Sequence, residues 1–230
     1  MTRLSKLLRG GLVCGALLVA SIPAMAITIN GSATWTGVVT LTTGGVLSFC
    51  APTNPQTPCP AIPVGPPGWN VPGSGTGDLA ANGGDAAGGT IATLSSVTNP
   101  VGTTLATPTL FMTFAGPPND ISFYMQTVFA GVGGTASCGA AAAAGQTCTP
   151  AGSAVTFLNV AGGNSSATIA AQGFARHASD AGTGFTNATP LQYVFTFQFN
   201  QPFQTVLTNF SSSGSLTATY SATATATATP

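Results

Sequence analysis

Apolar residues occupy every second position over residues 191–199, and the positions between them are mostly polar. The residues of the apolar face are Leu191, Tyr193, Phe195, Phe197 and Phe199. The residues between them are Gln192, Val194, Thr196 and Gln198. A period of two indicates a β-strand, and one largely aromatic face indicates that this side of a sheet covers the core.

Weaker alternation predicts further strands on both sides of this segment. Residues 33–42 and 46–50 flank Gly44-Gly45 and form a hairpin signal. A second hairpin is expected from 153–160 and 166–175, around Gly162-Gly163-Asn164. Strands are also expected at 104–115, with Leu110, Met112 and Phe114 on one face, and at 121–130, with Phe129 on the face of Ile121, Phe123 and Met125.

Only one segment has helical spacing. Pro202 precedes Phe203, Val206, Leu207 and Phe210, and Gly214 follows them. Proline at the start and glycine after the end predict one short helix near 202–212.

The last segment alternates small and hydroxyl residues and predicts a Thr/Ala strand at 215–229. Such a strand can complete its own sheet or pair with the sheet edge of another molecule. Intramolecular pairing is favoured up to Tyr220, and for 222–230 a strand and a frayed tail stay open. The residues of the candidate self-association strand are Thr217, Thr219, Tyr220, Thr223 and Thr225.

Residues 51–98 are rich in proline and glycine, which predicts a long loop with a short strand only near its end.

With about eight to ten strands and almost no helix, the sequence predicts an all-β fold, an antiparallel β-sandwich or jelly-roll-like domain spanning 27–230.

The first 26 residues resemble a secretory signal peptide. Three of the four basic residues, Arg3, Lys6 and Arg9, precede 13 apolar residues and Ala24-Met25-Ala26. The apolar run is shorter than the roughly 18 residues needed to cross a bilayer. We therefore expect cleavage after Ala26, no membrane span in the mature chain, and a secreted or cell-surface location.

The remainder has a single basic residue, Arg176, and four aspartates. A chain this poor in lysine and arginine lacks what a nucleic-acid binder needs to neutralise phosphates. It also lacks most of the side chains that catalysis uses, so we expect no enzyme and no catalytic residue, cofactor or metal site. His177 beside Asp180 is the remaining hydrolase candidate, against which stands the absence of a G-x-S-x-G motif.

Four cysteines remain after cleavage, and an even number in an exported chain predicts disulfides. Three pairings are open, and the spacing favours Cys50–Cys59 and Cys138–Cys148. Zinc is disfavoured because no C-x-x-C occurs and the single histidine is distant in sequence.

The layout resembles exported bacterial proteins of the PEP-CTERM kind. The segment Leu191-Gln-Tyr-Val-Phe-Thr-Phe-Gln-Phe and the alternating Thr/Ala/Ser end have that character. The chain departs from the family's pattern because it has no Pro-Glu-Pro, no final apolar helix and no terminal arginine cluster. The resemblance implies an extracytoplasmic β-protein and no particular anchor.

Two function classes follow from these observations. The first is a non-enzymatic surface, matrix or secreted structural or adhesive protein that associates with itself through sheet edges, since few charges oppose such pairing. The second is a module that binds surface glycans or another small ligand, with Trp69 in the 51–98 loop as the candidate contact.

Overall fold

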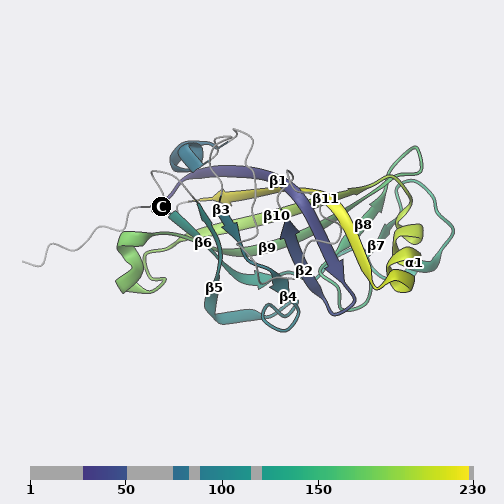
Figure 1. The fold of residues 1–230 in the computed structure, drawn as a ribbon, viewed down its shortest axis with the longest axis horizontal. Coiled ribbons are helices and arrows are strands. Elements are labelled where there is room, and N and C mark those ends of the chain that lie inside the picture. Colours follow the sequence, from purple (N-terminus) through teal and green to yellow (C-terminus); the bar gives the residue numbers. More distant parts are fainter. Residues whose placement is uncertain (1–27, 51–74, 83–88, 115–120, 228–230) are drawn as a thin grey trace, which may run out of the picture.

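The computed structural model describes residues 28–50, 75–82, 89–114 and 121–227 (Figure 1). The strands are β1 (Gly31–Thr42), β2 (Val46–Cys50), β3 (Gly89–Ile91), β4 (Leu94–Ser95), β5 (Thr104–Phe114), β6 (Ile121–Val128), β7 (Thr147–Cys148), β8 (Thr156–Asn159), β9 (Ser165–His177), β10 (Thr189–Phe199) and β11 (Ser215–Ala226). The helices are α1 (Phe203–Ser213) and three 3-10 turns, η1 (Gly77–Asn82), η2 (Ala136–Gly139) and η3 (Ala178–Thr183).

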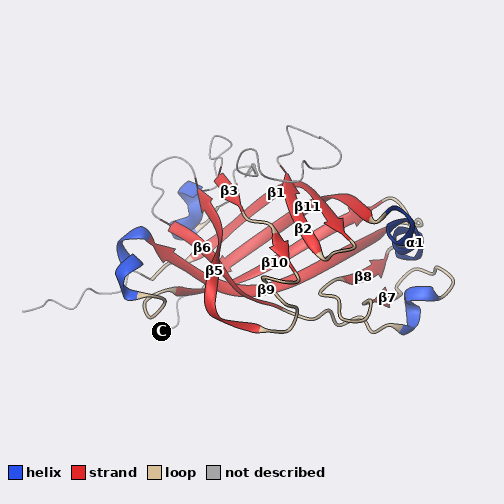
Figure 2. Cartoon of the chain, turned by 60° about the horizontal axis from the view of Figure 1, so that its bottom comes forward, coloured by secondary structure: helices blue, strands red, loops and turns tan. Residues whose placement is uncertain are grey.

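All strands belong to one antiparallel sheet that curls over itself (Figure 2). Its order is β3-β5-β6-β9-β10-β11-β1-β2-β4, and β8 with β7 adds to β9. The two end strands, β3 and β4, are joined by only Ala92 and Thr93. The segment 89–95 therefore pairs with β5 through its first half and with β2 through its second half, and it bridges the two edges of the curled sheet.

This architecture confirms the predicted all-β antiparallel class and the single α-helix. Both predicted hairpins form, β1 with β2 and β8 with β9. α1 begins after Pro202 and ends at Gly214, whose φ of 73° requires the left-handed conformation that glycine adopts most easily. The predicted signal peptide at 1–26 lies outside the described residues. No helix in the described ranges is long and apolar enough to cross a membrane.

The short strand expected near the end of the 51–98 loop is present, and it is divided into β3 and β4 on either side of Ala92 and Thr93. The division follows from pairing, because β3 pairs with β5 and β4 pairs with β2. The turn η1 within the same predicted loop was not expected.

The terminal strand is central in the sheet. β11 pairs with β1 from Ser215 to Ala226, and it pairs with β10 from Thr219 to Ala226. β11 ends at Ala226, earlier than the predicted end at residue 229. Intramolecular pairing is thus observed beyond Tyr220, and the candidate self-association strand is corrected: from Thr219 onward neither of its edges is open.

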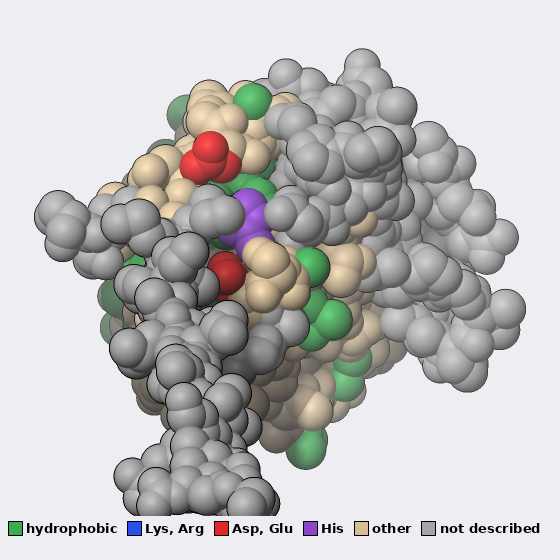
Figure 3. Space-filling model, turned by 90° about the vertical axis from the view of Figure 1, so that its left-hand side faces the viewer, with side chains coloured by type: hydrophobic (Ala, Val, Ile, Leu, Met, Phe, Trp, Pro, Cys, Tyr) green, Lys and Arg blue, Asp and Glu red, His purple; other side chains and the backbone are tan. Residues whose placement is uncertain are grey.

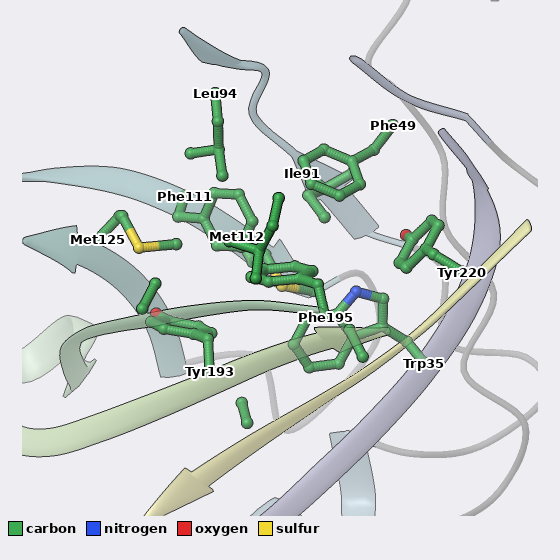
Figure 4. Close-up of a cluster of buried hydrophobic side chains, with 14 of the residues drawn as sticks. Trp35, Phe49, Ile91, Leu94, Phe111, Met112, Met125, Tyr193, Phe195 and Tyr220 are labelled. Carbon is green, nitrogen blue, oxygen red and sulfur yellow. The ribbon is translucent and has the colours of Figure 1, made fainter. Parts of the chain in front are cut away.

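Small residues of β11 make room for aromatic side chains on its neighbours. Ala222 lies opposite Trp35 of β1 and Phe195 of β10, and the two rings meet edge-to-face at 6.2 Å between centroids. Phe49 of β2 reaches Phe195 and Tyr220 from the facing side of the curl, at 5.6 and 5.2 Å (Figure 4). Large side chains facing small ones let the two halves of the sheet interdigitate.

Two β-bulges move side chains away from the faces that alternation predicts. The register of β5 and β6 shifts between Leu110 and Met112, and Leu110 becomes half-exposed while Phe111 and Met112 are both buried. The register of β6 and β9 shifts between Met125 and Thr127, and Phe129 ends up exposed. One extra residue in a strand reverses the facing of all later ones, which corrects the predicted positions of Leu110 and Phe129.

Candidate functional site

The structure confirms one of the predicted disulfides, and other sites predicted from the sequence lie outside the described residues. Cys138 and Cys148 form the predicted disulfide, with 5.1 Å between their Cα atoms. Cys59 and Trp69 lie outside the described residues, so the Cys50–Cys59 pair and the ligand contact at Trp69 stay predictions.

His177 and Asp180 lie at the end of the molecule opposite α1. His177 ends β9 and Asp180 belongs to the adjoining η3. Figure 3 shows that the histidine and acidic side chains gather on this end. No group of three or more His, Cys, Asp or Glu side chains suited to a metal ion occurs among the residues that the structure describes.

Arg176 fastens the 178–188 segment to the outer face of the sheet. Its guanidinium donates hydrogen bonds to the Tyr124 hydroxyl (2.8 Å) and to the Gly184 carbonyl (3.0 Å). It also lies 4.8 Å from the ring centre of Tyr124 and 5.0 Å from that of Phe185. Two hydrogen bonds and two cation–π contacts give the single basic residue of the described chain a structural role.

The threonines of the candidate self-association strand point outward, whereas Tyr220 points into the core. The register places hydroxyl side chains in one row across five strands, and the row consists of Thr36, Ser221, Thr196, Thr168 and Thr156. Thr40 and Thr217 share a hydrogen bond of 3.1 Å. These threonines therefore form part of a polar outer face that consists mainly of hydroxyl side chains.

A concave site opens beside α1, at the end of the curled sheet away from His177. It is a cavity of about 410 Å³. Its apolar walls include Leu41, Leu47, Leu94, Phe157, Ile169 and Leu216, and α1 contributes Leu207 and Phe210. Ligand sites of small molecules have this character, since they are concave, mostly apolar and roughly 300–1,000 Å³ in volume.

A second, smaller space extends the cavity toward the core. It shares Leu41, Leu47 and Phe157 with the outer cavity and adds Val39, Phe197 and Ala218. Ala218 lies between Leu216 and Tyr220 on the inner face of β11, so its small side chain leaves this room. Beyond it, Tyr220 and Phe49 close the interior.

A polar network holds α1 at the mouth of the cavity. Asn159 at the end of β8 accepts a hydrogen bond from the first backbone N–H of the helix, Phe203, at 2.9 Å, and it donates to Gln204 at 3.0 Å. Gln204 in turn donates to Gln146 and to the carbonyl of Ser137. An open N–H at a helix start is satisfied in this way by a side chain from another element.

The disulfide anchors the loop that carries this network, because Ser137 and Gln146 lie next to or between its cysteines. We expect the double variant Cys138→Ala/Cys148→Ala to lose about 2–3 kcal/mol of unfolding free energy, since the bridge closes a loop of about ten residues. Urea unfolding of both proteins under oxidising conditions measures the difference. Equal midpoints would show that the loop is ordered without the bridge.

The described walls of the cavity are uncharged. None of the described ionisable side chains lines it. Burial raises the pKa of Tyr193 and of Tyr220, so both phenols stay neutral at ordinary pH. Arg176 is seven residues beyond Ile169 along β9, which is about 23 Å at roughly 3.3 Å per residue.

No family model matches this chain, and no characterised protein or solved structure is significantly similar to it. The resemblance to PEP-CTERM proteins therefore stays a hypothesis that rests on layout alone.

The cavity could not be predicted from the sequence, because its walls come from segments that are distant in the chain. The helical spacing after Pro202 includes Leu207 and Phe210, and both line the cavity. A small residue such as Ala218 does not by itself reveal a space.

Proposed function

We propose that this protein binds an apolar small molecule in the cavity beside α1 and is not an enzyme. The observation that carries the proposal is a cavity of about 410 Å³ with apolar walls from both halves of the sheet and from the helix. A rigid sheet with a helix at its open end is a preformed frame, and this lowers the entropic cost of binding.

The proposal is tested with an environment-sensitive apolar fluorophore and a substitution that fills the cavity. Ala154 lines the cavity and is partly buried. We expect Ala154→Phe to weaken binding of the fluorophore at least tenfold, because the ring occupies the space of the ligand. Titration followed by fluorescence gives the dissociation constants.

Ala170→Phe is the matched control, since Ala170 is exposed on the outer face of β9. It should bind the fluorophore as the unaltered protein does. The proposal fails if the unaltered protein does not bind the fluorophore, or if the two variants are weakened equally.

Export, an extracytoplasmic location and contact with surface glycans through Trp69 remain predictions of the sequence. A structural or adhesive role also remains a prediction, but association through the terminal strand has lost its basis because β11 is paired on both sides. The end strands of the sheet, β3 and β4, are three and two residues long and follow one another in the chain, so they offer little edge for strand addition.

A further inference from the structure

The chemistry around the cavity narrows the class of ligand, and this step rests on the proposed function. We propose that the occupant is an uncharged amphiphile, a single alkyl or acyl chain that ends in a hydroxyl, ester or amide group. Three observations lead to this class: an apolar interior in two parts that share lining residues, neutral polar groups at one side of it, and no ionised side chain among the described residues of its walls.

The apolar part suits a chain. The outer cavity and its extension share Leu41, Leu47 and Phe157, and the extension continues between Val39 and Ala218 toward the aromatic core. A bulky rigid molecule would fill the outer part alone. A flexible chain also reaches the narrower part, and each buried CH₂ group contributes about 0.8 kcal/mol.

The polar part suits a neutral head group. Asn99 is buried at the cavity wall, where its amide donates to the Thr109 hydroxyl (3.3 Å) and its carbonyl accepts from the Thr98 hydroxyl (3.0 Å). These two bonds leave an amide N–H and a carbonyl lone pair for a further partner. Thr42, Thr43 and Ser96 add hydroxyl groups nearby. These side chains both donate and accept hydrogen bonds. A hydroxyl or amide head group can pair with donors and acceptors alike.

A charged head group is disfavoured by the same walls. A carboxylate or ammonium taken out of water needs an opposite charge or several strong hydrogen bonds. Arg176, one of the described charged residues, lies seven residues along β9 from Ile169 in the cavity wall. At roughly 3.3 Å per strand residue, this is about 23 Å. Asp78 binds the backbone of Asn30, at the opposite end of β1 from Leu41. Neither supplies a counter-ion at the cavity.

The test compares three ligands of equal chain length, decanol, decanoate and decylamine, by calorimetric titration of the full chain at pH 7. We expect decanol to bind at least tenfold more tightly than either ion. At about pH 3.5, below the roughly 4.3 at which a glutamate-like carboxyl titrates, decanoic acid is neutral and should approach decanol. The protein lines the cavity with no titrating group, so decanol itself should bind alike at both pH values.

A variant tests the same inference through a gain in affinity for decanoate. Ser96 is exposed at the cavity rim, so Ser96→Lys places a cation where the head group of decanoate would lie. We expect its affinity for decanoate at pH 7 to rise about two- to fivefold, which is the range of an exposed ion pair. Ser221→Lys, on the outer face of β11, carries the same charge away from the cavity and should not change decanoate binding.

The outcomes separate the two proposals. If none of the three ligands binds while the fluorophore also fails, the proposed function is wrong. If decanoate or decylamine binds as tightly as decanol at pH 7, the cavity does bind chains but the uncharged class is overturned. If Ser221→Lys raises decanoate affinity as much as Ser96→Lys does, the anion is attracted by net charge and the placement of the head group is wrong.

Discussion

Replacing Phe195 by alanine should lower the unfolding free energy by about 3–5 kcal/mol, the range for truncating a buried aromatic side chain. Phe195 is fully buried, and its ring contacts those of Trp35, Phe49 and Phe111 at 6.2, 5.6 and 5.9 Å. These partners come from β1, β2 and β5, so the ring joins both halves of the curled sheet (Figure 4). Urea unfolding followed by tryptophan fluorescence measures the loss.

The neighbouring residue provides the control. Val194 points to the outer face of β10 and is 44 % exposed. Val194→Ala removes apolar atoms from the same strand and should change stability by no more than about 0.5 kcal/mol. Similar losses in the two variants would mean that the aromatic cluster does not hold the two halves of the sheet together.

Replacing Gly173 by alanine should cost about 3 kcal/mol or more, because the new Cβ would overlap a backbone atom. Gly173 lies in β9, and a Cβ there would occupy the position of the Tyr124 carbonyl oxygen in β6. That carbonyl also accepts a hydrogen bond from the buried Tyr193 hydroxyl, at 3.0 Å. A backbone atom within a paired strand cannot turn aside as a side chain can, so β6 must shift and the Tyr193 bond must break.

Gly139→Ala is the matched control for this substitution. Gly139 has a negative φ, and a Cβ there would meet nothing within 4 Å. We expect its thermal unfolding midpoint to stay within a degree or two of the unaltered protein, since 1 kcal/mol corresponds to about 2–4 °C in a domain of this size. A midpoint of Gly173→Ala that equals that of Gly139→Ala would show that β6 and β9 separate without cost at this point.

Local patterns were sufficient wherever neighbouring residues alone decide the structure. The alternation at 191–199 predicted β10 with the correct inner face, and Pro202 and Gly214 predicted the limits of α1. Turn glycines predicted both hairpins. In each case the signal depends on a turn conformation or on one strand with one buried side, and these are properties of a few consecutive residues.

Local patterns failed where distant segments decide the outcome. The short strand expected near the end of the 51–98 loop is divided into β3 and β4 because they pair with β5 and β2, and the facing of Leu110 and Phe129 changes because bulges form in the pairing of β5 with β6 and of β6 with β9. The role of the terminal strand could not be derived from its regular Thr/Ala pattern, which suits an edge strand as well as a central one. Its place between β1 and β10 follows from Ala222, which has the size that Trp35 and Phe195 leave between them.

The sequence by itself determined the all-β class, the short helix after Pro202 and the scarcity of charge, and its cysteine spacing favoured the Cys138–Cys148 bridge. Each follows from residue type and spacing, which persist whatever the chain folds into. Only the tertiary structure decided that the sheet curls until β3 and β4 bridge its edges, that the Thr/Ala strand is enclosed, and that a cavity remains beside α1. A cavity is the volume that packed side chains from several strands leave empty, and no single segment of sequence contains it.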